Sequence, residues 1–240
     1  MRPPRRADLD ALFLDAGNTL VTLDHTLVCE VLTAVGVTAS TGSLARAEAA
    51  ARPVVSAFLA GGASSEGRDT FTVYVGTILR GLGADGAAVE TLAPRIVRTL
   101  RHEVGTQRLW SQVLPGVPDA LRALRAAGLR LVVVSNSDGT IEAGLREMGL
   151  RDQVDAVIDS AVVGAEKPDP AIFRHGLSAA GTRPERTLHV GDLYDVDIVG
   201  ARRAGLHGLL LDPYGDWESV DCPTAADVPA LARTLLDGGR

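Results

Sequence analysis

A series of short apolar runs, each ending abruptly at a polar residue, constrains the fold of this chain more than any other feature. Continuous apolar runs of this length are typical of strands buried on both faces. Strands of that kind belong to parallel sheets that carry helices on both sides. The runs and the residues that follow them are 11–14 before Asp15, 129–134 before Ser135, 156–158 before Asp159, 187–190 before Gly191 and Asp192, and 209–211 before Asp212.

Helical patterns lie between these runs, and each pattern stops at a glycine. A glycine directly after a helix is typical of a left-handed C-terminal cap. Strand and helix alternate over short connections, as they do in repeated βαβ units. The sequence therefore predicts an α/β fold with a doubly wound parallel sheet. The helical segments and their glycines are 117–127 with Gly128, 141–148 with Gly149, 170–180 with Gly181, and 196–204 with Gly205.

Residues 24–110 do not follow this alternation, because they contain no clear buried strand. Their apolar residues instead recur at helical spacing. We therefore expect an α/β core formed by residues 1–23 and 111–240, and a helical insertion formed by residues 24–110. The helical segments expected in the insertion are 27–35, 43–59, 71–82 and 87–104.

Composition indicates which kinds of partner and which cellular compartment are expected for this protein. The net charge of −6 disfavours a nucleic-acid partner, since proteins that bind nucleic acid usually carry a basic field. No apolar stretch is long enough to cross a bilayer, so no membrane association is expected. Cys29 and Cys222 are far apart and lack metal-binding spacing, which favours idle thiols in a cytoplasmic protein. A small molecule is the expected partner, and the oligomeric state is not indicated.

Polar side chains at the ends of three predicted strands form a candidate site. Ligands of open α/β sheets bind outside the carboxyl ends of the strands, so these side chains should face one crevice. Asp15 can act as a nucleophile toward phosphorus, and Ser135 with Asn136 can hold an oxyanion or phosphate. Asp192 is a carboxylate of the type that binds Mg²⁺, and Asp197 can orient Asp192 or a coordinated water.

Each of these residues also has a purely structural interpretation. Asp15 alone would cap the following turn, and Ser135 with Asn136 would cap the next helix. Asp197 and Asp195 would place negative charge at a helix N-terminus. The functional interpretation gains support because all the groups are expected at the same edge of the sheet.

Lys167 is the one lysine among 24 basic residues, and it lies in a turn stiffened by Pro168 and Pro170. An ammonium group there could hold Asp15 ionised and neutralise phosphate charge. The alternative interpretation is a solvated loop lysine. The rarity of lysine in this chain favours the functional interpretation.

The segments around Asp15, Ser135, Lys167 and Asp192, in this order, resemble the four motifs of the haloacid dehalogenase-like hydrolase superfamily. The resemblance covers residues 10–22 and 112–215. The insertion is similar to the helical C1 cap of subfamily I. By this resemblance the fold would be a Rossmann-like core with an inserted cap, and the activity would be that of a phosphatase.

The resemblance also implies a role for each site residue. Asp15 would be the catalytic nucleophile that forms an aspartyl-phosphate, and Lys167 the catalytic lysine of the third motif. Thr19, Ser135 and Asn136 would bind the substrate, which would be a small phosphorylated metabolite. The cofactor would be Mg²⁺. Its ligands would be Asp15, the backbone carbonyl of Gly17 and Asp192, with Asp197 in support.

One position departs from the resemblance. Phosphatases of this family usually carry an Asp two residues after the nucleophile, where it protonates the leaving group and activates water, but this chain has Gly17. General acid–base catalysis contributes about 10²–10⁴-fold, so alkyl phosphates should be cleaved slowly. Asp24 or His25, a few residues downstream, is a candidate substitute.

Two other functions stay open at this point. A haloacid dehalogenase also lacks the second Asp, but that branch is typically metal-free and usually carries Tyr where this chain has Gly17. The second open function is that of a weakly active or non-catalytic module that binds a phosphorylated ligand or a protein. The presence of Asp15, Lys167 and Asp192 together counts against such a binder. A phosphonate-cleaving relative would need a lysine in the insertion, which residues 24–110 lack.

Overall fold

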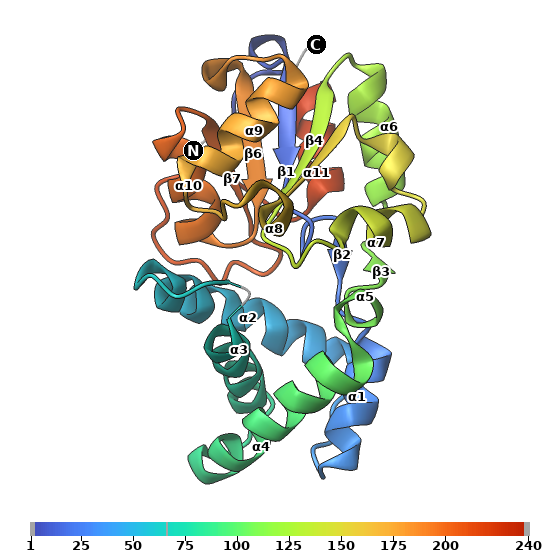
Figure 1. Cartoon of the computed structure of the whole chain (residues 1–240), viewed down its shortest axis with the longest axis vertical. Helices are drawn as coiled ribbons and strands as arrows, with labels where there is room; N and C mark the ends of the chain where they lie inside the picture. Colours follow the sequence, from blue (N-terminus) through green and yellow to red (C-terminus); the bar gives the residue numbers. More distant parts are fainter. Residues whose placement is uncertain (1–2, 66, 238–240) are drawn as a thin grey trace. The chain divides into compact units, whose positions relative to one another are not determined.

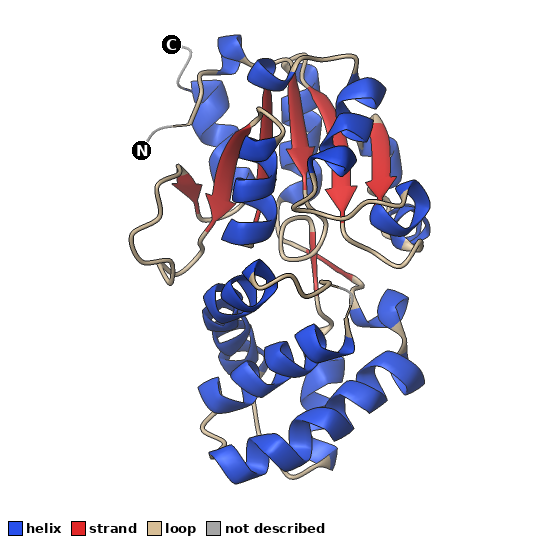
Figure 2. Ribbon diagram, turned by 60° about the vertical axis from the view of Figure 1, so that its left-hand side comes forward, coloured by secondary structure: helices blue, strands red, loops and turns tan. Residues whose placement is uncertain are grey.

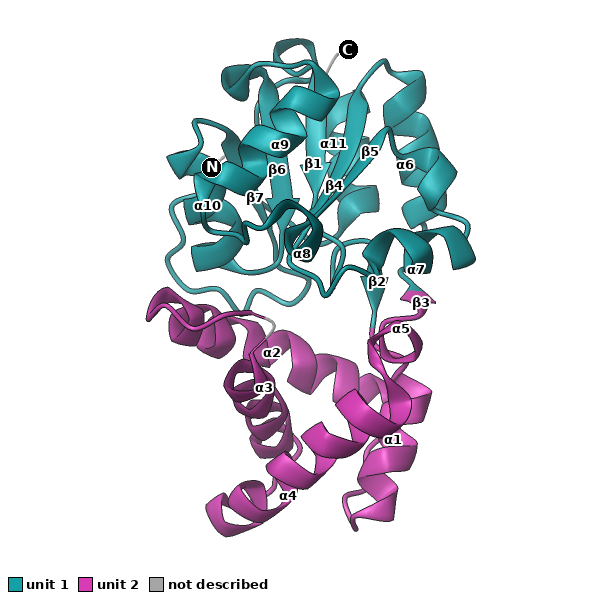
Figure 3. Ribbon diagram, viewed as in Figure 1, with its two compact units in different colours: residues 1–22, 113–240 teal, residues 23–112 magenta. Residues whose placement is uncertain are grey.

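The structure is a computed structural model that describes residues 3–65 and 67–237. The chain divides into two compact units, one formed by residues 1–22 and 113–240, the other by residues 23–112 (Figure 3). None of the helices in the described residues combines the length and the hydropathy that crossing a membrane requires.

A six-stranded sheet forms the centre of the first unit (Figure 1). Its strand order is β5-β4-β1-β6-β7-β8, and every neighbouring pair is parallel. The expected doubly wound parallel sheet is therefore confirmed. The strands are β1 (Ala11–Leu14), β4 (Arg130–Ser135), β5 (Ala156–Asp159), β6 (Thr187–Gly191), β7 (His207–Leu211) and β8 (Thr224–Ala225). A separate two-stranded sheet pairs β2 (Val21–Thr22) with β3 (Gln112–Val113).

The position of β1 in this order explains where a ligand can bind. From β1 the chain builds outward through β4 and β5, and it then returns to β6 on the other side of β1. The order of the strands thus reverses beside β1, and such a switch point opens a crevice at the carboxyl ends of the strands. Leu14, the last residue of β1, is in register with Val133 of β4 and Val190 of β6, so the three strand ends lie together (Figure 2).

Helices cover both faces of the sheet, which is why its strands are apolar on both sides. Leu12 and Leu14 of β1 face a core shared with helices α6 and α11. Ala11 and Phe13 face a second core shared with α9 and α10. The helices of this unit are α6 (Val117–Ala126), α7 (Ile141–Glu147), α8 (Ser160–Val163), α9 (Pro170–Ala180), α10 (Val199–Arg203) and α11 (Val228–Asp237), and a π-helical turn, η5 (Tyr194–Ile198), leads into α10. Single 3-10 turns are η1 (Arg6–Asp8), η3 (Arg151–Gln153) and η4 (Pro184–Arg186).

The glycines that were expected to end the helices adopt the left-handed conformation. Gly128, Gly149, Gly181 and Gly205 have φ angles of 85°, 70°, 62° and 82°. A side chain is disfavoured at such angles, and glycine is not. These residues therefore let the chain leave each helix and return to the sheet.

In the described part of the second unit, every regular element is helical except Gln112, which begins β3. The helical elements of the unit are α1 (His25–Ala34), α2 (Thr41–Ala60), α3 (Arg68–Gly81), α4 (Gly86–Arg98), the π-helical η2 (Thr99–Val104) and α5 (Thr106–Leu109). Its interior includes a buried carboxylate, Glu48, which accepts hydrogen bonds from His25 at 2.9 Å and from Tyr74 at 2.7 Å.

Candidate active site

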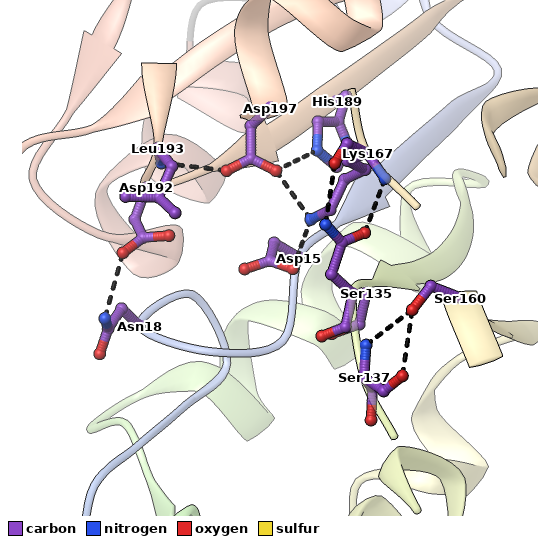
Figure 4. A network of polar contacts seen from close by, with 11 residues as sticks. Asp15, Asn18, Ser135, Ser137, Ser160, Lys167, His189, Asp192, Leu193 and Asp197 are labelled. Atoms are coloured by element: carbon purple, nitrogen blue, oxygen red, sulfur yellow. Dashed lines mark hydrogen bonds and ion pairs between the residues drawn. The ribbon is translucent and has the colours of Figure 1, made fainter. Parts of the chain in front are cut away.

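Three carboxylates converge where β1 and β6 end (Figure 4). Asp15 directly follows β1, Asp192 directly follows β6, and Asp197 lies in η5. Each offers an oxygen within 4.8 Å of the others. Asp192 and Asp197 are buried, and Asp15 is 9 % exposed. The parallel register that aligns β1 with β6 thus brings together residues that are about 180 positions apart in the sequence.

Lys167 supplies a positive charge to this cluster. Its Nζ donates to Asp15 Oδ1 at 2.5 Å and to Asp197 Oδ1 at 2.8 Å. Burial alone would lower the pKa of Lys167, but the two carboxylates raise it above its ordinary value. The two carboxylates therefore favour the charged form of Lys167, which contacts Asp15. The solvated-loop interpretation does not hold, because the side chain of Lys167 is buried.

The carboxyl groups that share Lys167 differ in their pKa. Burial would raise the pKa of Asp197, but Lys167 and His189 together lower it well below its usual range. Burial raises the pKa of Asp15, and the ammonium group of Lys167 opposes that shift. A second cation beside Asp15 would oppose that shift further, because an opposite charge favours the ionised carboxylate.

Asn136 holds the loop that carries the lysine. Its Oδ1 accepts from the backbone N–H of Lys167 at 2.7 Å, and its Nδ2 donates to the carbonyl of Lys167 at 2.9 Å. These two bonds connect the end of β4 to a loop 31 residues later. The side chain of Asn136 therefore fixes the backbone from which the ammonium group extends.

The neighbouring serines shape the loop after β4. Ser135 is buried, and its Oγ donates to the carbonyl of Asn136 at 3.3 Å. Ser160, which sequence reasoning did not single out, accepts from Ser137 N at 2.9 Å and donates to Ser137 O at 3.0 Å. Thr19 is also buried, and its hydroxyl has no hydrogen-bond partner within the described part of the chain.

His189 is a second site residue that sequence reasoning missed, because the run 187–190 was treated as uniformly apolar. It lies in β6 with no exposed surface, and its Nε2 is 2.9 Å from Asp197 Oδ1. Burial lowers the pKa of His189, although Asp197 opposes the shift. Because a carboxylate oxygen only accepts hydrogen bonds, Nε2 of His189 carries the proton that it donates to Asp197. A histidine inside an otherwise apolar strand was the signal available in the sequence.

Asp197 accepts hydrogen bonds from three protein donors. Its Oδ1 accepts from Lys167 and His189, and its Oδ2 accepts from the backbone N–H of Leu193 at 3.0 Å. The carboxylate also packs on the bare backbone of Gly191, where a Cβ atom would overlap it. Asp197 is therefore better placed to orient Lys167 than to bind a metal directly.

The donor set fits a hard divalent cation. Asp15, Asp192 and Asp197 carry three negative charges against the single positive charge of Lys167, and Mg²⁺ prefers carboxylate oxygens. Gly17, two residues after Asp15, is half-buried in the turn after β1 and forms a bridge with Val21. No side chain at this position supplies a further carboxylate.

The candidate substitutes for that carboxylate both make contacts within the second unit. Asp24 caps α1 by accepting from Leu27 N at 3.0 Å. His25 contacts Glu48.

A family model and the similar proteins of known family agree on the family of this chain. A family model described as haloacid dehalogenase-like hydrolase matches residues 9–205. The chain is 40 % identical over 157 residues to the human haloacid dehalogenase-like hydrolase domain-containing protein 3, covering 63 % of this chain and 59 % of that protein. It is 34 % identical over 122 residues to a ribulose-1,5-bisphosphate 5-phosphatase of Halopiger xanaduensis, covering 50 % of each. The chain spans about half to three-fifths of the length of the curated relatives it matches.

A solved structure shares the fold over nearly the whole chain. The HAD-hydrolase YfnB of Bacillus subtilis, whose crystal structure is described as bound to magnesium, superimposes with a TM-score of 0.63 at 20 % identity. The match covers 97 % of this chain and 99 % of that chain.

Proposed function

Because the chain belongs to the haloacid dehalogenase-like hydrolase family, we propose that it is a Mg²⁺-dependent phosphatase that uses Asp15 as its nucleophile. The observation that carries the proposal is the contact of Lys167 with Asp15 at 2.5 Å beside the carboxylate of Asp192. A nucleophile, a fixed cation and a metal ligand at one strand edge form the set that phosphoryl transfer requires. The substrate is a small phosphorylated metabolite. The phosphatase named among the relatives supports that class of substrate.

The reaction proceeds in two displacements at phosphorus. An oxygen of Asp15 attacks, the bond between phosphorus and the ester oxygen breaks, and the alcohol leaves with a proton drawn from water. Water then attacks the aspartyl-phosphate, which releases inorganic phosphate and restores the carboxylate. Lys167 favours the ionised form of Asp15 and neutralises charge on the phosphoryl oxygens in both steps.

Mg²⁺ bound by Asp15 and Asp192, together with the backbone carbonyl of Gly17, would supply charge neutralisation for the phosphoryl group. Asp197 holds Lys167 in place, and Asn136 holds the lysine loop. Ser135 and Thr19 would donate their hydroxyl groups to the phosphoryl oxygens. Ser135 would first give up its weak contact with the carbonyl of Asn136, whereas the buried Thr19 hydroxyl has no hydrogen-bond partner among the residues the structure describes.

We assign the helical unit, residues 23–112, as the C1-type cap that selects the substrate. Its elements α1 to α5 form a compact body of their own. Insertions and loops on a rigid scaffold are where substrate choice usually lies.

Hydrolysis of p-nitrophenyl phosphate by the purified protein, with Mg²⁺ and with EDTA, tests the proposal. We expect turnover that requires Mg²⁺ and is lost in Asp15→Asn. The exposed Asp152→Asn is the matched control and should keep full activity. Chloride release from chloroacetate without metal would instead identify a haloacid dehalogenase. Silence in both assays would identify a non-catalytic binding module.

A further inference from the structure

Asn18 connects the nucleophile turn to the carboxylate of Asp192. Its Nδ2 lies 3.1 Å from Asp192 Oδ2, and the residue is 8 % exposed (Figure 4). A carboxylate oxygen only accepts hydrogen bonds, so the amide nitrogen, not the amide oxygen, faces Asp192. This contact joins residues 174 positions apart and belongs to none of the roles described above.

The turn holds Asn18 in an unusual backbone conformation. Its φ angle is +53°, and the only other non-glycine residue with a positive φ in the described part of the chain is Ser219. Asn tolerates this left-handed region better than most residues do. The backbone N–H of Asn18 donates to Val21 O at 2.6 Å, and Thr22 Oγ1 donates to Asn18 Oδ1 at 3.4 Å. The side chain is therefore fixed at both ends before any ligand arrives.

The chemistry of the amide matters at this position. Asp15, Asp192 and Asp197 already place three negative charges against one lysine, so a fourth carboxylate beside Asp192 would add repulsion. An amide donates a hydrogen bond without adding charge. It can therefore hold one oxygen of Asp192 and leave the other directed into the cluster.

We infer that Asn18 is a positioning residue that orients Asp192 for a divalent cation. The inference rests on the magnesium site of the proposed function. Residues that orient metal ligands typically change metal affinity about 10–100-fold when they are removed. The same range is expected here, because the contact acts on a carboxylate that would bind the ion directly.

Asn18→Gly tests the role of the amide separately from that of the backbone turn. Glycine adopts a positive φ without strain, so the turn is preserved while the amide is lost. We expect the dissociation constant for Mg²⁺, measured by isothermal titration calorimetry on the protein without substrate, to rise about 10–100-fold. Ser219→Gly relieves the same backbone strain at an exposed residue of another loop, and it should leave the constant unchanged.

A second variant tests the role of charge. Asn18→Asp replaces the donor with a carboxylate that faces Asp192, so its melting temperature without metal should fall below that of the wild type. Addition of Mg²⁺ should raise that temperature by more than it does in the wild type, because the cation relieves the repulsion. Circular dichroism checks that both variants are folded.

The outcomes separate this inference from the proposed function. Saturable Mg²⁺ binding by the wild type with an equal dissociation constant in Asn18→Gly would overturn the role of Asn18 and leave the metal site intact. Wild-type melting behaviour of Asn18→Asp would also overturn the role of Asn18. Absence of saturable binding in the wild type would overturn the metal site and this inference with it.

Discussion

The Nε2 atom of His189 and the Nζ atom of Lys167 meet at one oxygen of Asp197, and the His189 contact to that oxygen is 2.9 Å long. His189 is fully buried, and the ring of Phe173 in α9 packs edge-on against it at 5.0 Å between centroids. Its second nitrogen, Nδ1, has no hydrogen-bond partner among the described residues. Among the described residues, the imidazole of His189 therefore makes its one hydrogen bond to the carboxylate that orients the lysine.

Replacing His189 tests whether this contact supports catalysis. His189→Leu removes the hydrogen bond to Asp197 Oδ1, so Asp197 is held less firmly in the position from which it orients Lys167. We expect kcat on p-nitrophenyl phosphate to fall about 10–100-fold. His189→Gln places an N–H at a similar reach and should recover most of the activity. Equal losses in both variants would show that the histidine contributes packing and not orientation.

Lys167 is expected to contribute to catalysis and to stability. Lys167→Met leaves the buried carboxylates of Asp15 and Asp197 without their cation. Breaking a buried ion pair in this way costs about 3–5 kcal/mol of unfolding free energy, and kcat should fall about 10²–10³-fold. Urea unfolding and steady-state kinetics measure the two effects. The exposed Arg203→Met is the matched control, and wild-type activity of Lys167→Met would contradict the proposed role.

Gly17 predicts a preference for activated leaving groups. Without a carboxylate two residues after Asp15, an aryl phosphate should be hydrolysed much faster than an alkyl phosphate. Gly17→Asp should raise kcat/KM for glycerol 2-phosphate by about 10²-fold, because it supplies an acid to the leaving oxygen. Gly17→Asn has a side chain of the same size but no acid, and it should give no gain. Equal wild-type rates on both ester types, unchanged in Gly17→Asp, would mean that another residue already supplies the proton.

Glu48 should make the stability of the helical unit depend on pH. Burial would raise the pKa of Glu48, but His25, Arg52 and Tyr74 together lower it below its ordinary value. A carboxyl group whose folded pKa is depressed contributes stability above its unfolded pKa of about 4.3 and loses that contribution as pH falls through the folded pKa.

Glu48→Gln is therefore expected to lower the unfolding free energy by about 2 kcal/mol at pH 7. Its difference from the wild type should shrink toward zero in acid, where the wild-type carboxyl is protonated. Urea unfolding between pH 7 and pH 3 measures the trend. Glu90→Gln, at an exposed position of α4, serves as the control. A constant difference across that range would contradict the assignment.

Much of the core fold follows from patterns that the sequence displays directly. The apolar runs that end at Asp15, Ser135 and Asp192 correspond to β1, β4 and β6, because a strand buried on both faces has few polar positions. Parallel pairing then places their ends at one edge. The contact of Lys167 with Asp15 could be anticipated only as a possibility. The length of the loop before α9 does not determine where the side chain of Lys167 points.

Other features were beyond the reach of sequence patterns. β8 and the pair β2 and β3 are two-residue strands, too short to show alternation. The helix was expected to begin at Val196, but α10 begins at Val199. The preceding residues, from Tyr194, form the π-helical turn η5, which places Asp197 against Gly191. Asn18 has a left-handed backbone conformation, and its contact with Asp192 joins residues 174 positions apart, which no local sequence pattern indicates.

The bare backbone of Gly191 limits how this scaffold can change. A library that randomises the end of β6 should return only glycine at this position, since even alanine would displace Asp197 and, through it, the lysine. A substitution at position 191 would therefore disturb the lysine that contacts the nucleophile. New substrate preferences in descendants of this enzyme would have to arise from residues that leave the β6 end untouched.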